Sequence, residues 1–319
     1  MSILAFAGHF HLRRWHGLRL LAVDGSTARL PNEHRIAQEF SGPADADRPL
    51  ARVSQLYDVL NHVIVRADLV PYATGEREIA SSYLYDAAAE DLLLYDRGYP
   101  AFWLIAQHRD MARHFCMRTS LSASREVIDF VASGQTTARV ALHPCPEPVT
   151  VRLVRVTLDT GETEVLITSL LDEQAFPSTW FKALYHHRWA VEESYKRAKC
   201  RIEIENFSGK SALSVYQDFH AKVLALNLGA MFVWIARTVV ERLSARCRYP
   251  YRVNFANALT QMKNRIVRWL LGPDPAATAG ALVIQIARSA ESVRPGRSAP
   301  RRRNAQKCRD FHGNYKRTR

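Results

Sequence analysis

Two short apolar runs, each followed at once by an aspartate and then by a glycine, constrain the fold more than any other feature of the sequence. Residues 19–23 are Arg-Leu-Leu-Ala-Val and lead into Asp-Gly-Ser at 24–26. Residues 92–95 are Leu-Leu-Leu-Tyr and lead into Asp-Arg-Gly at 96–98. Apolar runs of this length bounded by turn residues predict buried strands. We therefore expect two buried strands that each end in a carboxylate and a glycine turn.

The residues between these runs predict a mixed sheet. Residues 51–59 and 62–70 have the composition of a pair of strands, and residues 75–90 place apolar side chains on one side of a helix. The order of strand, strand pair, helix and strand predicts an α/β fold with a mixed sheet and flanking helices. Residues 115–171 are richer in strand-forming residues, which predicts an inserted β subdomain.

The clearest hairpin in that β-rich segment joins residues 149–158 to residues 165–170 around the turn Asp-Thr-Gly-Glu at 159–162. After it, the sequence predicts a helical C-terminal part. One long helix is expected from about Ser178, a plausible N-cap, to about Lys199. Further helices are expected at 212–243, broken once, and at 254–271, before Gly-Pro-Asp-Pro at 272–275 ends the well-defined region.

Composition excludes several classes of protein. A chain of 319 residues with 47% hydrophobic residues is long and apolar enough to bury a core, which excludes a disordered or fibrous protein. The five cysteines are scattered and form no pair of metal-binding or disulfide spacing, which favours a reducing, intracellular setting. The longest apolar stretch, residues 223–236, is shorter than the ~20 residues of a membrane-spanning helix. We therefore expect a buried core helix there and no membrane partner.

The net charge of +13 is unevenly distributed. Residues 288–319 carry eleven Lys and Arg and two acidic residues, so +9 of the +13 lies in this terminal segment. The rest of the chain has an ordinary charge balance. The segment is either a solvated tail or an arm that binds phosphates, and the sequence leaves these alternatives open.

Four polar residues of the predicted long helix share one face. At about 100° per residue, Tyr185, Arg188, Glu192 and Lys199 fall within an arc of roughly 60°. A phenol, a guanidinium, a carboxylate and an ammonium in line suit a phosphate backbone with a metal ion near its centre. On spacing alone, a solvated face with an Arg188–Glu192 ion pair is the better interpretation.

The functional interpretation of Glu192 depends on the two acids expected at the strand ends. Asp24, Asp96 and Glu192 lie far apart in the sequence, yet they would converge if a helix crossed the carboxyl edge of the sheet. Two divalent ions about 4 Å apart need clustered oxygen ligands, and such a pair stabilises both the attacking and the leaving oxygen in phosphoryl transfer. The three acids are therefore candidate metal ligands.

The three motifs together resemble a known family. Asp24-Gly25-Ser26-Thr27, Asp96-Arg97-Gly98-Tyr99 and the spacing Tyr185-(2)-Arg188-(3)-Glu192-(6)-Lys199 are similar to those of the bacterial insertion-sequence DDE transposases with a Y-R-E-K signature, the family named after insertion sequence four. The resemblance covers residues from about 18 to 243. It implies a ribonuclease-H-like core interrupted by a β-rich insertion.

The resemblance also implies roles for these residues. Asp24, Asp96 and Glu192 would be the catalytic triad and the metal ligands, holding two Mg²⁺ or Mn²⁺ ions, and Tyr185, Arg188 and Lys199 would contact DNA. The reaction implied is hydrolysis of a phosphodiester at the end of the mobile element, followed by strand transfer. The implied partners are transposon-end and target DNA and a second copy of the chain, in the bacterial cytoplasm and at the nucleoid.

Two alternatives remain at this point. One is a ribonuclease-H-like nuclease that cuts without strand transfer, and the other is an inactive or domesticated fragment that only binds DNA. The family usually has a helical domain before the first catalytic Asp, whereas only 23 residues precede Asp24, so we expect an N-terminally truncated form.

The expected organisation follows from the motifs and the resemblance. The expected segments are, in order, 1–17 as the remnant of a missing N-terminal region, 18–110 as the first half of the core, 111–175 as the β-rich insertion, 176–271 as the second half of the core with the Glu192 helix and the C-terminal helices, and 272–319 as a basic, disordered tail.

Overall fold

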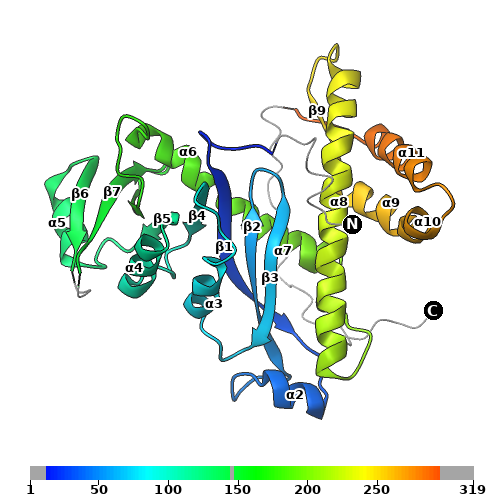
Figure 1. The fold of residues 1–319 in the computed structure, drawn as a ribbon, viewed down its shortest axis with the longest axis horizontal. Helices are drawn as coiled ribbons and strands as arrows, with labels where there is room; N and C mark the ends of the chain where they lie inside the picture. The colour runs from blue at the N-terminus through cyan, green and yellow to red at the C-terminus, as the bar shows by residue number, and fades with distance from the viewer. Residues whose placement is uncertain (1–11, 144–146, 295–319) are drawn as a thin grey trace. The chain divides into compact units, whose positions relative to one another are not determined.

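The computed structural model describes residues 12–143 and 147–294 (Figure 1). These residues form two compact units. The first contains the residues up to Ala28 together with Phe40–Lys196, and the second contains Arg29–Glu39 together with the residues from Arg197 on. All strands of the central sheet lie in the first unit, apart from the last residue of its first strand, so this unit carries the candidate site.

The first unit is built on an eight-stranded sheet. Its strand order is β3-β2-β1-β4-β5-β8-β7-β6. The strands are β1 (Arg19–Arg29), β2 (Leu50–Asp58), β3 (Val63–Pro71), β4 (Asp91–Tyr95), β5 (His114–Thr119), β6 (Thr137–Leu142), β7 (Val149–Thr157) and β8 (Thr163–Thr168). β4 is parallel to β1 and to β5, whereas β2–β3, β5–β8, β7–β8 and β6–β7 are antiparallel. The expected mixed sheet, the β2–β3 pair and the β7–β8 hairpin are confirmed.

The register between β1 and β4 aligns the two aspartates. Paired residues run from Arg19 opposite Asp91 to Val23 opposite Tyr95, so Asp24 and Asp96 come next on neighbouring parallel strands. Adjacent strands lie about 4.8 Å apart. The start of the register is fixed by a two-pronged ion pair, because Arg19 donates from Nε and Nη2 to the two carboxylate oxygens of Asp91 at 2.7 and 2.6 Å.

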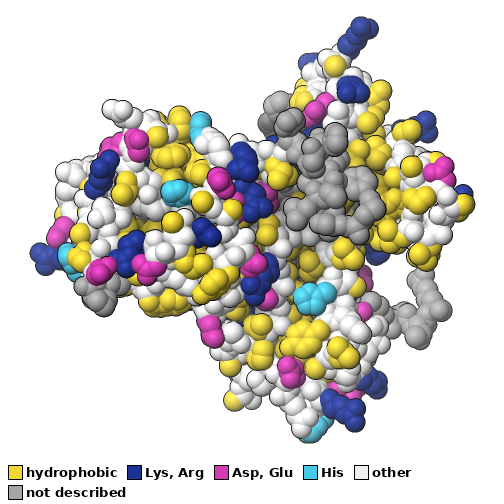
Figure 2. All heavy atoms as spheres, viewed as in Figure 1, with side chains coloured by type: hydrophobic (Ala, Val, Ile, Leu, Met, Phe, Trp, Pro, Cys, Tyr) yellow, Lys and Arg dark blue, Asp and Glu magenta, His cyan; other side chains and the backbone are white. Residues whose placement is uncertain are grey.

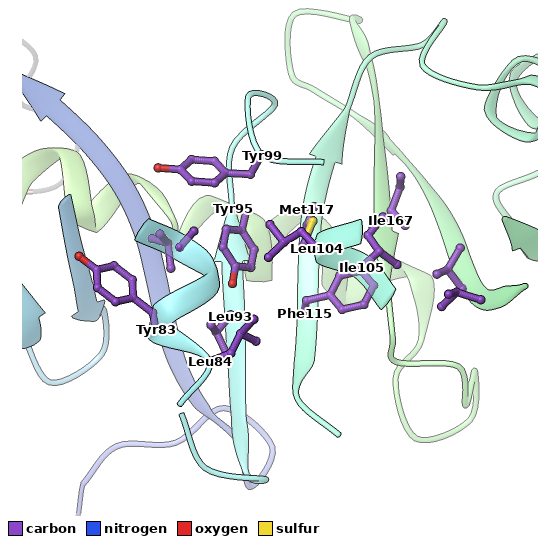
Figure 3. Packing of buried hydrophobic residues seen from close by; sticks show 14 of the residues in the cluster. Tyr83, Leu84, Leu93, Tyr95, Tyr99, Leu104, Ile105, Phe115, Met117 and Ile167 are labelled. Carbon is purple, nitrogen blue, oxygen red and sulfur yellow. The ribbon is translucent and has the colours of Figure 1, made fainter. Parts of the chain in front are cut away.

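Helices α3 (Glu76–Tyr83), α4 (Phe102–Asp110) and α5 (Arg125–Ser133) contribute buried side chains to the main hydrophobic cluster. Figure 3 shows the side chains of Tyr83 from α3, Leu104 from α4, and Tyr95 and Phe115 from β4 and β5 in this cluster. The alternate residues of the central strands, such as Leu92 and Leu94, are also fully buried. Burial on both faces is typical of the parallel part of a sheet and explains the near-continuous apolar runs in the sequence.

Two local expectations near the site are wrong. β1 does not end at Asp24 but continues through Gly25 to Arg29, so Asp24 lies within the strand. Gly25 does not make a turn there: its φ is not positive, and a Cβ at this position would lie 2.8 Å from Cδ of Glu76. The glycine therefore allows the close approach of the Glu76 side chain. The expected helix over 75–90 is shorter and ends at Tyr83.

The β-rich segment is not separate from the core sheet. β5, which falls in the range expected for the insertion, pairs in parallel with β4, and β8 pairs directly with β5. The strands after β5 therefore extend the same sheet at its edge (Figure 1). The physical reason is that β5 would otherwise leave a row of unpaired backbone groups at the edge of the sheet.

The second unit is mainly helical. Its long helix α8 (Ala212–Ser244) contacts α9 (Phe255–Lys263) and α11 (Pro275–Arg288), and α10 (Ile266–Leu271) contacts α11. The short strands β9 (Tyr251–Arg252) and β10 (Glu291–Ser292) pair antiparallel, and α2 (His34–Phe40) belongs to this unit except for its last residue. The region expected to end at 272–275 thus continues into α11, whose first turn is capped by the Asp274 carboxylate, which accepts the N–H of Ala277. The rest of the basic tail, from 295 on, lies outside the described residues.

The break expected in the helix at 212–243 is absent from α8, which runs for 33 residues. Its Gly229 permits close packing instead, because a Cβ there would lie 3.2 Å from Cδ1 of Leu259. The helix over 254–271 divides into α9 and α10. In the described part of the chain, α8 is long and apolar enough to cross a membrane by length and composition alone, and a core helix that packs on α9 and α11 meets the same criterion.

The charge of the described surface agrees with the sequence expectation. On the face drawn in Figure 2, Lys and Arg side chains are interspersed with Asp and Glu side chains. Most of the excess positive charge belongs to the segment after residue 288.

We expect Asp91→Ala to lower the free energy of unfolding by about 3 kcal/mol, because it leaves the Arg19 guanidinium without its buried partner. Asp91 is 2% exposed and also accepts the backbone N–H of Ala88. Urea unfolding followed by circular dichroism measures this loss. Asp110→Ala is the control, since its ion pair with Arg109 is exposed and is expected to contribute less than about 1 kcal/mol. Equal effects of the two substitutions would contradict the role assigned to the Arg19–Asp91 pair.

Candidate active site

The residues of the Y-R-E-K signature lie on two helices rather than one. A 3₁₀ turn (Ser178–Trp180) leads into α6 (Phe181–His186), and α7 (Trp189–Arg201) follows after His187 and Arg188. The expectation of one continuous helix from Ser178 is therefore wrong, and the N-cap position is occupied by Pro177 rather than by Ser178. Tyr185 is on α6, Arg188 is at the joint, and Glu192 is on the first turn of α7.

The hydrogen bonds of the joint explain the break. The backbone N–H groups of residues 187, 188, 190 and 191 donate to the carbonyls three positions earlier rather than four. Such bonds wind the chain tighter than an α-helix, at 3.0 residues per turn. The angle of about 100° per residue therefore does not hold across the joint. Whether Tyr185 and Glu192 lie on a common face is decided by how α6 and α7 meet, and not by the repeat of a single helix.

Asp24 lies within β1, directly after the residues that pair with β4. Its Oδ1 accepts the backbone N–H of Gly25 at 2.9 Å. Burial raises the pKa of Asp24 to about 6, with smaller upward contributions from Glu192 and Asp96 that partly offset the downward effects of Gly25 and Arg188. These interactions show that the three acids, from three different elements, lie near enough to influence one another.

Asp96 follows β4 and is held by Tyr185 and Arg118. The Tyr185 hydroxyl lies 3.2 Å from Oδ1 of Asp96 and equally far from the carbonyl oxygen of Tyr95. Nη2 of Arg118 lies 2.8 Å from the same Oδ1. Burial acts to raise the pKa of Asp96, but the Arg97 backbone N–H, the two nearby guanidinium groups and the Tyr185 hydroxyl together hold it below its usual value.

Glu192 pairs with Arg188, whose Nη2 lies 2.7 Å from Oε1 of Glu192. The ion pair expected from the sequence is therefore confirmed, but only its Glu192 carboxylate is partly exposed to solvent, because Arg188 is buried. The Nε and Nη1 atoms of Arg188 are buried without a hydrogen-bond partner, and its guanidinium lies 5.7 Å from the ring centre of Tyr185. Arg188 thus retains donors for a further acceptor at the site.

The first part of α7 is tied to the sheet by two hydroxyl groups. Tyr195 donates to the carbonyl oxygen of Asp24 at 2.7 Å, and Ser194 donates to Oε1 of Gln55 on β2 at 2.9 Å. Both residues are buried. Because Glu192 is less than one turn away on the same helix, these bonds fix it with respect to Asp24.

The donor set is chemically suited to divalent cations. Carboxylate oxygens are the ligands that Mg²⁺ and Mn²⁺ favour, and a cation would offset the mutual repulsion that contributes to the raised pKa of Asp24. Within the described ranges, no three His, Cys, Asp or Glu side chains lie close enough together to hold one ion. In this structure Arg118 and Arg188 instead pair with Asp96 and Glu192. The shared metal site of Asp24, Asp96 and Glu192 stays a prediction.

Two hollows adjoin the site. One has a volume of about 540 Å³, and its lining includes Arg97, Ser120 and Ser122. The other has a volume of about 840 Å³, and its lining includes Lys182, Tyr185, His187, Arg188 and Trp189. Arg118 and Glu164 line both hollows. The site therefore opens on either side of this ion pair.

Sequence reasoning missed Arg118, Glu164 and Tyr195. Arg118 is a charged residue that directly follows three apolar residues of β5, and this contrast was the available signal. Its partner Glu164 is 46 positions away and has no local signal, because the pairing of β5 with β8 brings the two together. Lys199 lies in the last turn of α7 and in the second unit, and its role stays a prediction.

Comparison with known proteins identifies the family. Residues 15–228 match the family described as "Transposase DDE domain", a range that contains every residue of the three motifs. The chain belongs to this family. The match, together with the two relatives below, confirms the resemblance to the insertion-sequence-four transposases.

Two curated relatives from Escherichia coli K12 are similar to the chain. The transposase InsG of insertion sequence element IS4 is 27% identical over 235 residues, which cover 67% of this chain and 52% of InsG. The putative transposase InsZ is 25% identical over 123 residues, which cover 36% of this chain and 41% of InsZ. The chain thus matches about half the length of these relatives. Among solved structures, the piggyBac transposase synaptic complex with hairpin DNA matches with a TM-score of 0.47 and 8% identity, covering 90% of this chain and 60% of that one.

We expect Asp24→Asn to stabilise the protein in the presence of a chelator at neutral pH. The raised pKa of Asp24 means that ionising this carboxyl disfavours folding, an effect fully present above about pH 6 and lost as the pH falls toward 4. A shift of about two units corresponds to roughly 2–3 kcal/mol. Thermal unfolding midpoints across this pH range measure the difference.

The exposed Asp129, which pairs with Arg125, provides a control for this experiment. Asp129→Asn is expected to leave the pH dependence of the unfolding midpoint as in the unmodified chain. If the Asp24→Asn variant follows the same pH dependence as the unmodified chain, the pKa of Asp24 is not raised by its burial in the fold.

Proposed function

We propose that this chain catalyses DNA transposition, cutting phosphodiester bonds at the ends of an insertion element and joining the freed ends to target DNA. The observation that carries the proposal is the register of β1 with β4, which places Asp24 and Asp96 next to the last paired residues of two neighbouring parallel strands, together with the Tyr195 hydrogen bond that ties the helix of Glu192 to Asp24. Membership of the DDE transposase family supports it.

The three acids are proposed as the catalytic residues and as ligands of divalent cations, which the family uses. We propose two ions, Mg²⁺ or Mn²⁺, which when bound would stabilise charge on the attacking and leaving oxygens. The protein's part is to hold the three carboxylates in place through the β1–β4 register and the Tyr195 and Ser194 hydrogen bonds. The lowered pKa of Asp96 supports a carboxylate that is ionised and ready to bind a cation at neutral pH.

Tyr185, Arg188 and Lys199 are proposed to contact the phosphates of the element's end. Tyr185 and Arg188 both line the larger hollow, and Arg188 has two buried donors without partners. A planar guanidinium with free donors suits a two-pronged contact with phosphate. Lys199 would add a charge further along α7.

The partners proposed are transposon-end DNA, target DNA and a second copy of the chain that holds the other end. The named relative InsG is a transposase for an insertion sequence element, which supports DNA as the substrate. By this proposal the protein acts at the bacterial nucleoid.

We expect Glu192→Gln to abolish Mg²⁺-dependent cleavage of element-end DNA while leaving the fold intact, because it removes one metal-binding charge and keeps the size of the side chain. Gel analysis of end-labelled duplexes measures cleavage. Glu193→Gln is the matched control: Glu193 is the next residue of α7 and pairs with the exposed Lys196. Retained cleavage in the Glu192→Gln variant would refute the assignment.

The same assay distinguishes strand transfer from simple hydrolysis. With a pre-cut element end as donor, joined products are expected for the unmodified chain and for Glu193→Gln. Cleavage without joined products would indicate a ribonuclease-H-like nuclease, and DNA binding without cleavage would indicate a fragment that only binds DNA.

A further inference from the structure

Arg118 forms ion pairs with two acids, only one of which is a proposed metal ligand. Its Nη2 lies 2.8 Å from Oδ1 of Asp96, and its Nη1 lies 2.6 Å from Oε1 of Glu164. Its Nε is buried without a hydrogen-bond partner. One guanidinium thus neutralises a proposed metal ligand and, at the same time, an acid that the proposed chemistry does not use.

Glu164 is a rigid partner for Arg118. Arg118 pairs with Leu166 across the β5–β8 ladder, so Glu164, two residues along β8, is on the same face of the sheet. Diagonal neighbours of this kind are within reach of long side chains. The Glu164 side chain is only 16% exposed. Asp96, in contrast, follows the end of β4 and its side chain is 34% exposed.

The surroundings of Arg118 can accept an anion on either side. Arg118, the partner of Asp96, lines both hollows together with Glu164. The smaller hollow is lined by Ser120, Ser122, Arg97 and the acidic Glu162, among others, and Arg97 donates to the Ser120 hydroxyl at 3.0 Å. Hydroxyl groups and guanidinium groups are the donors that bind phosphate oxygens. A phosphate in either hollow would lie beside Arg118.

We infer that Arg118 is an exchangeable cation of the site: it pairs with Asp96 when no divalent cation is bound there, and when one is bound it stays anchored to Glu164 and directs its freed Nη2 to a DNA phosphate. Glu164 is then a positioning residue, because it holds Arg118 in place during the exchange. The inference rests on the proposed function, from which it takes the cation at Asp96 and DNA as substrate.

The exchange couples cation binding to DNA binding. A divalent cation repels the guanidinium from Asp96 and makes one more phosphate contact possible, so the cation strengthens DNA binding. By linkage, DNA strengthens cation binding by the same factor. A static structural ion pair predicts no such coupling through Arg118.

The first test is calorimetric titration of Ca²⁺ into the full chain without DNA. Arg118→Ala should bind Ca²⁺ about tenfold more tightly, because the competitor for Asp96 is gone, and Glu164→Gln should bind it about tenfold more weakly. In the Arg118→Ala background, Glu164→Gln should have little further effect, since it acts through Arg118. An equal effect of Glu164→Gln in both backgrounds would overturn the inference, because it would reflect only the loss of a nearby negative charge.

The second test measures DNA affinity by fluorescence anisotropy against salt concentration, with Ca²⁺ or with a chelator. In the unmodified chain, the slope of log affinity against log salt should be steeper with Ca²⁺ by about 0.9, the value for one additional phosphate contact. This increment should vanish in Arg118→Ala. If the alanine variant unfolds, Arg118→Gln has the same expected outcome with a longer side chain.

Arg66 on β3 provides the matched control for both tests. It also bridges two acids, Asp68 and Asp86, none of which belongs to the candidate site. Arg66→Ala should behave as the unmodified chain does. If the unmodified chain binds no Ca²⁺, the proposed function and this inference both fail. If it binds Ca²⁺ and cleaves DNA with Mg²⁺ while Arg118→Ala keeps the slope increment, only this inference fails.

Discussion

The parallel alignment of β1 with β4 is the constraint on which the rest of the site depends. Arg19 and Asp91 form an ion pair at one end of the alignment, and Asp24 and Asp96 follow the other end, five residues further along each strand. The attraction between Arg19 and Asp91 thus sets the register of the two strands. The same register brings the mutually repelling carboxylates of Asp24 and Asp96 together. A shift of one residue would turn Asp24 to the opposite face of the sheet. The apolar residues between the two pairs are buried on both faces of the sheet. Their burial stabilises the fold and offsets the repulsion between the two carboxylates.

Sequence patterns predicted the parts of the fold that local chemistry decides. The apolar runs before Asp24 and Asp96 form β1 and β4, and the turn at 159–162 joins β7 to β8. The errors occur where tertiary contacts override a local signal. Gly25 indicates a turn, yet it serves the approach of Glu76 to a continuing strand. The break expected within 212–243 is absent from α8, whose Gly229 allows close packing against Leu259.

The residues of the candidate site also fall into two groups: those that a local motif identifies and those that only tertiary contacts bring to the site. The acids and the signature residues could be identified from motifs, because their spacing is a property of the chain. The residues that hold the acids could not, because Tyr195 reaches the carbonyl of Asp24 across 171 positions and Arg118 reaches Glu164 across 46. The break between α6 and α7 was also invisible, since it depends on hydrogen bonds that shift from four residues to three. A motif thus identifies which residues act, whereas packing decides which residues position them.

The continuity of the sheet through β5 and β8 has a consequence for how the protein opens. β8 completes the hydrogen bonding of β5, and β7 and β6 follow in the same ladder, so this segment cannot detach without exposing the edge of a core strand. Its backbone amides should therefore exchange with solvent together with those of β4 and β5, as one cooperative unit. The hairpin that carries Glu164 is in this sense part of the scaffold of the active site, and slow hydrogen exchange along β8 would be its signature.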